Sequence, residues 1–192
     1  MKKLILQPFV YAQEKQLLLI GLSMAFLGCL LQLTKNVRLF SSLQVKSVPV
    51  PPTLLQSIAD FGISTFALTL TLFILGYYIN AKTRLVDIFN TVLIAKLALS
   101  PLLIIPLDYA MDLLNNLEEQ VKQDQKIGGD YLVMFLHITL GAFVVLLCIL
   151  FSRYLYQGFK TATHVKKNAH LILFVLLVLL VELCIPSLTN LY

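Results

Sequence analysis

Charged residues are scarce in this sequence of 192 residues. Only 13% of them are Asp, Glu, Lys or Arg, against roughly one-quarter in an ordinary soluble domain. Hydrophobic residues make up 58% of the chain, the mean hydropathy is +0.84, and the apolar residues arrive in long blocks. A soluble amphipathic protein would interrupt such blocks with polar residues. We therefore expect most of the chain to be surrounded by lipid or by other membrane-spanning helices.

The signatures of catalysis and of metal binding are also missing. The sequence contains no Gly-x-Ser-x-Gly elbow, no Walker loop and no His-Glu-x-x-His motif. Its three histidines are too scattered to form a metal site. The three cysteines, Cys29, Cys148 and Cys184, lie inside apolar blocks without a Cys-x-x-Cys pair, so we interpret them as reduced small hydrophobes. We expect no catalytic residue, no cofactor and no metal, and predict that the protein is not an enzyme.

What the sequence does contain is five long apolar blocks. They predict an all-α polytopic membrane bundle of five transmembrane helices that forms a single domain over residues 1–192. The predicted spans cover about residues 17–33, 60–79, 89–107, 132–151 and 171–185. The second helix is expected to begin before its span, because Thr53 and Gln56 match a capping box directly after two prolines.

Two of the connecting loops show a pattern of their own. In the third loop, residues 109–126, apolar side chains recur at helical spacing and polar ones fill the opposite face, which predicts an amphipathic helix on the outer surface. The apolar positions are Met111, Leu114, Leu117 and Val121. The first loop, residues 37–48, alternates weakly and is followed by prolines, so we expect it to be extended and exposed.

The distribution of Lys and Arg predicts the orientation in the membrane. Nine of them flank the spans on the side of the N-terminus, namely Lys2, Lys3, Lys15, Lys82, Arg84, Arg153, Lys160, Lys166 and Lys167. Only five lie on the other side, namely Lys35, Arg38, Lys46, Lys122 and Lys126. Cytoplasmic loops carry the excess of positive charge, so the N-terminus is expected in the cytoplasm and the C-terminus outside.

The basic residues of the fourth loop have a second possible role. Arg153, Lys160, Lys166 and Lys167 could attract anionic lipid headgroups, at about 1 kcal/mol for each positive charge. The sequence pI is 9.1, but the positive charges are not interleaved with aromatics in one patch. We therefore expect the lipid bilayer, and not nucleic acid, to be the partner of these residues.

Three polar residues lie at membrane depth. Lys96, His137 and Glu182 fall inside predicted spans, and an ionisable group in that position is expensive unless it serves a function or has a partner. One interpretation is a proton or ion relay built from the three. The other is that Lys96 extends to the cytoplasmic interface while Glu182 is hydrogen-bonded or protonated inside the bundle. In either case Glu182 should face the bundle interior, within reach of Lys96.

Prolines and small residues shape two of the spans. Pro101 and Pro106 leave backbone carbonyls without partners, so the third span is expected to kink, either for gating or for packing. Gly21, Ala25 and Gly28 share one face of the first span and suit close helix packing, within the bundle or between protomers. The second alternative predicts a homo-oligomer or another membrane-protein partner.

Two stretches carry a family resemblance. Residues 80–107 form a short loop, an amphipathic helix start and a proline-containing span, and residues 153–183 form a tyrosine-rich span exit, a basic loop and a final span. With Gln-Pro-Phe at residues 7–9, the chain resembles the bacterial branch of the Yip family, the Ypt/Rab-interacting membrane proteins. The resemblance implies a multipass protein of the bacterial inner membrane without catalytic activity.

The same resemblance implies a partner only for other members of the family. Eukaryotic members bind Rab-type GTPases through a long cytosolic N-terminal region, whereas about sixteen residues precede the first span here. The family's Asp-Leu-Tyr-Gly-Pro motif is absent, which puts GTPase binding in doubt. The sequence favours a non-enzymatic protein that organises membrane or partner proteins. The alternative is a small transporter or permease subunit that uses Lys96, His137 and Glu182.

Overall fold

A computed structural model describes residues 8–11, 13–35, 37–39, 41–43, 45–48, 50–103, 131–165 and 167–189. A short helix, α2 (Pro8–Tyr11), precedes α3 (Glu14–Lys35), and α4 (Leu54–Ile79) follows after two strands. The helix α5 (Leu85–Leu97) continues into a 3-10 turn, η1 (Ser100–Leu103). The last two helices are α7 (Tyr131–Thr163) and α8 (Asn168–Thr189). The predicted amphipathic helix at residues 109–126 lies outside the described residues.

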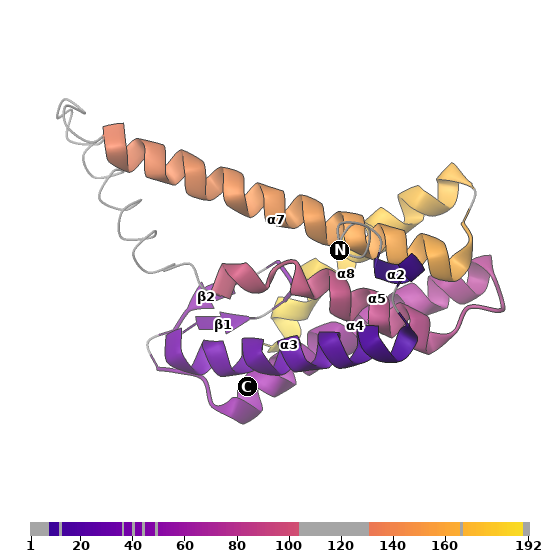
Figure 1. The fold of residues 1–192 in the computed structure, drawn as a ribbon, viewed down its shortest axis with the longest axis horizontal. Coiled ribbons are helices and arrows are strands. Elements are labelled where there is room, and N and C mark those ends of the chain that lie inside the picture. The colour runs from indigo at the N-terminus through magenta and orange to yellow at the C-terminus, as the bar shows by residue number, and fades with distance from the viewer. Residues whose placement is uncertain are drawn as a thin grey trace.

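Four of these helices are long and apolar enough to cross a membrane. They are α3, α4, α7 and α8, and they correspond to four of the five predicted spans. In Figure 1 α3 and α4 run in opposite directions along the bundle, and so do α7 and α8. The four apolar helices indicate an integral membrane protein, and the helical class is as the sequence predicts.

The predicted third span differs from the other four, because its helix is short. Helix α5 ends at Leu97, one turn before Pro101. A proline ring collides with the carbonyl four residues earlier in an α-helix, and that carbonyl belongs to Leu97. The hydroxyl of Ser100 donates to the same carbonyl oxygen at 2.8 Å. Pro101 thus lies in the 3-10 turn η1, while Pro106 lies outside the described residues.

Helix α5 occupies the centre of the bundle. It packs against α3, α4 and α7, and α8 packs against α4 (Figure 1). Every residue from Asn90 to Lys96 is buried, so the helix is covered on all sides, as expected for a core helix. The outer helices instead expose large apolar side chains such as Phe26, Phe66 and Ile149.

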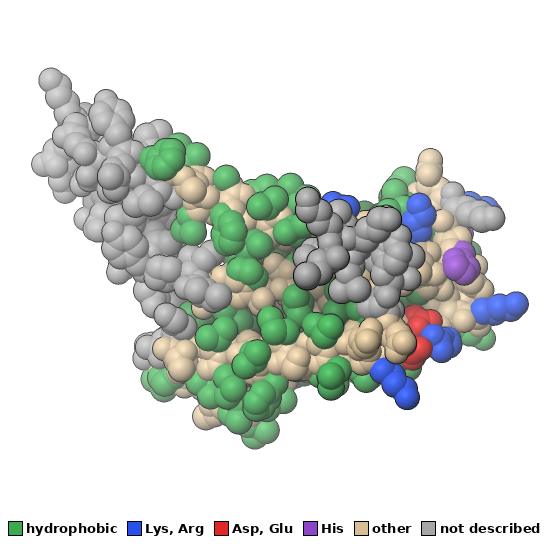
Figure 2. Space-filling model, viewed as in Figure 1, with side chains coloured by type: hydrophobic (Ala, Val, Ile, Leu, Met, Phe, Trp, Pro, Cys, Tyr) green, Lys and Arg blue, Asp and Glu red, His purple; other side chains and the backbone are tan. Residues whose placement is uncertain are grey.

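Figure 2 shows hydrophobic side chains along the flanks of the helices and charged ones gathered toward one end. That end holds the start of α3, the turn between α4 and α5 and the turn between α7 and α8. Arg84 joins two of these segments, because its guanidinium bonds Glu14 of α3 at 2.9 Å and Asp87 of α5 at 2.7 Å. The bonds to Asp87, and then those to Glu14, raise the pKa of Arg84 above its ordinary value.

Local signals in the sequence account for two details of the packing. The capping box is confirmed: Thr53 Oγ1 accepts from the Gln56 backbone N–H, and the Gln56 side chain accepts from the Thr53 N–H. The small residues of α3 serve contacts within the bundle. A Cβ on Gly21 would lie 2.8 Å from Leu93 Cβ, so α3 and α5 approach closely there.

The expectation that the first loop is exposed was wrong. The loop is extended, and it forms an antiparallel pair of strands, β1 (Val37–Leu39) and β2 (Val45–Ser47), with Arg38 opposite Lys46. However, Val37 is only 2% exposed, and Ser41 and Ser42 at the turn are 2% and 4% exposed. The hairpin is held against the bundle by two carboxylates. Asp60 of α4 accepts from the Arg38 guanidinium, and Glu182 of α8 accepts from the Leu43 backbone N–H.

Candidate functional site

The site is built on a polar stripe along one face of α4. Ser57, Asp60, Ser64, Thr65 and Thr69 are each 3% exposed or less. Successive members lie three, four, one and four residues apart, which places them on one side of an α-helix. The stripe faces α5 and the hairpin, so that an otherwise apolar helix carries hydroxyl and carboxylate groups into the core.

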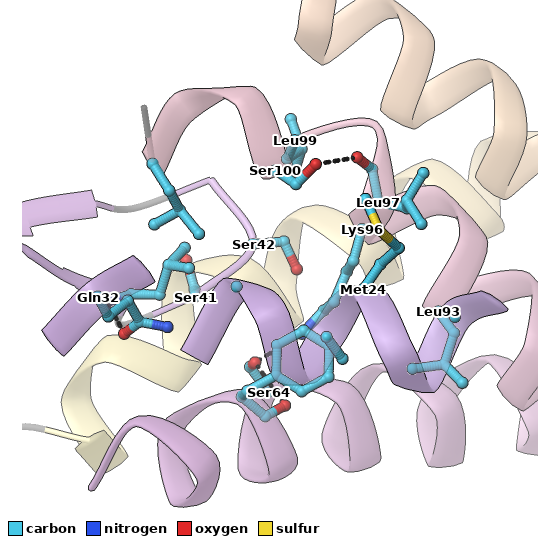
Figure 3. A pocket seen from close by; sticks show the side chains of 16 residues that line it. Met24, Gln32, Ser41, Ser42, Ser64, Leu93, Lys96, Leu97, Leu99 and Ser100 are labelled. Carbon is cyan, nitrogen blue, oxygen red and sulfur yellow. Dashed lines mark hydrogen bonds between the residues drawn. The ribbon is translucent and has the colours of Figure 1, made fainter. Parts of the chain in front are cut away.

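Lys96 of α5 is anchored to this stripe. Its Nζ donates to Ser64 Oγ at 2.6 Å and to Thr65 Oγ1 at 3.0 Å. The ring of Phe61 lies beneath the ammonium group at 4.9 Å, within the range of a cation–π contact. Figure 3 shows the side chain reaching from α5 toward Ser64. Lys96 is 8% exposed, so it is held inside the bundle and does not extend to the cytoplasmic interface.

A second buried charge on α4 is paired with the hairpin. Asp60 is fully buried, and Arg38 of β1 reaches it with Nε at 2.6 Å from Oδ2 and Nη2 at 3.1 Å from Oδ1. This fork-to-carboxylate geometry is the strongest form of a side-chain ion pair. The pair fixes the hairpin against the N-terminal part of α4.

Glu182 of α8 also holds the hairpin. Its Oε2 accepts from the backbone N–H of Leu43 at 3.2 Å, and the side chain is 5% exposed. The carboxylate therefore faces the interior, as the cost of a charge in lipid requires. Ser42 lines the same cavity as Lys96, and the next residue, Leu43, bonds Glu182, but within the described residues no ion pair joins Lys96 and Glu182.

Two cations, the buried Lys96 and the half-buried Arg38, balance two buried carboxylates. Arg38 and Lys96 contribute two positive charges, and Asp60 and Glu182 contribute two negative ones. Burial of a single charge would require its neutralisation, whereas this set is neutral as a whole. The four side chains come from β1, α5, α4 and α8, so the balance exists only when these elements are assembled.

The other predicted site residues are spread over the molecule. His137 lies in the first half of α7, but its side chain is outside what the structure describes. Arg153 and Lys160 are exposed on the last turns of α7, and Lys167 is exposed in the turn before α8. Lys166 lies outside the described residues. The structure thus brings Lys96 and Glu182 to one region and places the basic residues elsewhere.

A cavity of about 50 Å³ lies beside Lys96, between α3, α5, η1 and the hairpin turn. Its polar wall is formed by Gln32, Ser41, Ser42, Ser64, Lys96 and Ser100. Figure 3 shows Ser41, Ser42 and Gln32 across the cavity from Ser64. Most of the remaining wall is apolar and includes Met24, Leu93 and Leu97. Glu182 does not line the cavity.

Sequence reasoning missed Arg38, Asp60, Gln32 and the two serines of the hairpin turn. Asp60 stands at the first position of the predicted second span, and Arg38 lies in the loop that was expected to be exposed. The spacing of Ser57, Asp60 and Ser64 was a readable signal, because three polar residues on one face of an apolar helix predict a buried polar contact. Nothing local to the hairpin indicates that its turn is buried.

Among the described residues, no three His, Cys, Asp or Glu side chains are placed to hold a metal ion. The buried thiol of Cys29 donates to the Ser57 carbonyl at 3.6 Å. What the buried groups can do is fix the hairpin and present hydrogen-bond donors to the cavity. No protein-family model, curated protein or solved structure matches this chain.

Proposed function

We propose that this chain is a non-enzymatic, five-span membrane protein of the Yip type that organises membrane or partner proteins. The proposal places it in a bacterial inner membrane with the N-terminus in the cytoplasm. The span that this proposal adds to α3, α4, α7 and α8 is the third along the chain. It consists of α5 with η1, which together cover residues 85–103. Nineteen residues at 1.5 Å per residue reach about 28 Å, close to the thickness of the hydrocarbon core.

The observation that carries the proposal is how the buried charges are held. Lys96 is bonded to two hydroxyls, Asp60 is paired with Arg38, and Glu182 accepts from a backbone N–H. A transport relay needs groups that exchange partners along a continuous path. The cavity reaches Lys96 but not Glu182, so fixed structural roles fit these residues better than a relay.

Five spans can be distinguished from four by labelling one loop. In a background without Cys29, Cys148 and Cys184, single cysteines replace Gln13, Ala81, Asn168 or Ser187. If α5 with η1 crosses the membrane, the cysteine at 168 should react from the cytoplasmic side together with those at 13 and 81. The cysteine at 187 should react from outside.

A four-span protein gives a different pattern. If α5 turned back without crossing, the cysteine at 168 would react from outside. That result would refute the crossing of the membrane by α5 with η1. A cysteine replacing Val50, which is exposed beyond the outer end of α3, is the matched control. It should react from outside in both arrangements, provided that α3 spans the membrane.

Proton flux distinguishes the proposed function from the transporter alternative. Proteoliposomes containing the wild-type protein or Glu182→Gln should dissipate a pH gradient no faster than protein-free vesicles. The variant should remain folded, because the Gln amide oxygen can still accept from the Leu43 N–H. A proton ionophore that collapses the gradient shows that the vesicles are sealed. Flux through the wild type that Glu182→Gln abolishes would assign a transport function instead.

A further inference from the structure

The cavity beside Lys96 is lined by several buried polar atoms that have no hydrogen-bond partner among the described residues. Gln32 is 1% exposed, and its Oε1 accepts from the Leu39 backbone N–H at 3.2 Å. Its Nε2 has no hydrogen-bond partner among the described residues, and neither have the hydroxyls of Ser41 and Ser42. Buried polar atoms are normally satisfied. Three unsatisfied ones around one cavity therefore indicate that something else fills their bonding capacity.

The unsatisfied groups around the cavity are all able to donate. An amide NH2 and two hydroxyls offer N–H and O–H groups, and the Lys96 ammonium has three donors of which two are used by Ser64 and Thr65. No carboxylate lines the cavity. Asp60 is paired with Arg38. Glu182 Oε2 accepts from the Leu43 N–H, and its buried Oε1 has no partner among the described residues, but this carboxylate does not line the cavity. The cavity therefore favours a group that is rich in acceptors and negatively charged.

The rest of the cavity wall is suited to a hydrocarbon. Met24, Leu93 and Leu97 line it, together with the small residues Ala25 and Gly28. Met24 is also 36% exposed on α3, so the apolar wall continues to the outer flank of an apolar helix. A volume of about 50 Å³ holds only a few waters, which is the size of a small head group and not of a whole lipid.

We propose that this cavity binds the head group of an anionic amphiphile, a carboxylate or a phosphate, through Lys96, Gln32, Ser41 and Ser42. The hydrocarbon chain leaves along the apolar wall beside Met24. The same ligand chemistry can come from a free fatty acid or from the phosphate of a lipid. The site does not depend on whether the protein organises partners or transports a solute.

Binding to the purified protein in non-ionic detergent tests this proposal. Native mass spectrometry and thermal melting are used with laurate, dodecyl phosphate and the uncharged dodecanol as probes. At least one of the two anions should bind at least tenfold more tightly than dodecanol and raise the melting temperature. A preference for laurate assigns a fatty-acid carboxylate, and a preference for dodecyl phosphate assigns a lipid phosphate.

The decisive variant is the double substitution Ser41→Ala and Ser42→Ala. Removing two hydroxyls without partners should not weaken the fold, yet anion binding should fall by about tenfold or more. Lys96→Met should abolish the preference for anions, and Lys82→Met, which removes an exposed lysine in the turn between α4 and α5, should leave it unchanged. Since Lys96→Met also breaks two buried hydrogen bonds, the serine variant tests the site even if Lys96→Met fails to fold.

Three results would overturn the proposal. In the first, dodecanol binds as tightly as both anions. In the second, the serine variant retains full anion binding. In the third, acetate and inorganic phosphate bind as tightly as their long-chain counterparts, which would leave no role for the apolar wall.

Discussion

Replacing Gly158 with alanine should force α5 and α7 apart and destabilise the protein. A Cβ at this position would overlap Thr91 Oγ1 and lie 2.5 Å from Thr91 Cγ2 and 2.8 Å from its Cβ. Thr91 cannot easily move, because it is β-branched and its hydroxyl bonds the Asp87 carbonyl at 2.8 Å. Overpacking of this kind typically costs about 1–3 kcal/mol and occasionally more.

The higher helix propensity of alanine offsets part of that loss of stability. Alanine is the better helix former, by about 1 kcal/mol over glycine, but the overlap with Thr91 should outweigh this gain. Gly141→Ala is the matched control, because Gly141 lies on the same helix and no atom lies within 4 Å of its Cβ position. Thermal melting in detergent should show a lower transition temperature for Gly158→Ala and an unchanged or higher one for Gly141→Ala. Equal melting temperatures for the two variants would contradict the close approach of α5 and α7.

Replacing Arg38 with methionine should be the most damaging change in the hairpin. It removes the guanidinium from Asp60, which is fully buried in α4. Breaking a buried ion pair by removing one partner costs about 3–5 kcal/mol, because the remaining charge is left inside an apolar environment. Unfolding of the purified protein by denaturing detergent, compared with the wild type, measures the loss.

A double-mutant cycle separates the charge from the packing. Adding Asp60→Asn to Arg38→Met should recover much of the stability, since the buried carboxylate charge is then gone. Arg84→Met is the control for loss of an ion-paired arginine, because Arg84 bonds Glu14 and Asp87 at an exposed position and such pairs contribute little. If Arg38→Met proves as mild as Arg84→Met, the pair with Asp60 does not hold the hairpin.

The sequence by itself determined where four long apolar helices lie and how one of them starts. Block length and hydropathy are local properties, and the capping box of Thr53 and Gln56 is a contact between residues three apart. The inward orientation of Glu182 also follows from the sequence, because a charge facing lipid is expensive wherever the helix packs. The end of α5 before Pro101 is a local effect as well, since it reflects a clash within one turn.

The tertiary structure alone decided which charges meet. Lys96 was expected within reach of Glu182, but it bonds Ser64 and Thr65, while Glu182 accepts from Leu43. Arg38 and Asp60 are 22 residues apart, and Leu43 and Glu182 are 139 apart. No periodicity encodes such pairs, because each depends on how helices are rotated and on where the hairpin is drawn in.

The cavity depends on the same assembly. Its donors come from α3, the hairpin turn and α5, and each of these residues looks unremarkable in its own segment: a glutamine at the end of an apolar helix, two serines in a loop and one lysine in a span. The sequence therefore determined a helical membrane protein with costly charges at membrane depth. The tertiary structure decided the partners of those charges. A buried charge is costly unless it is paired or hydrogen-bonded, and the partners come from segments far apart in the sequence.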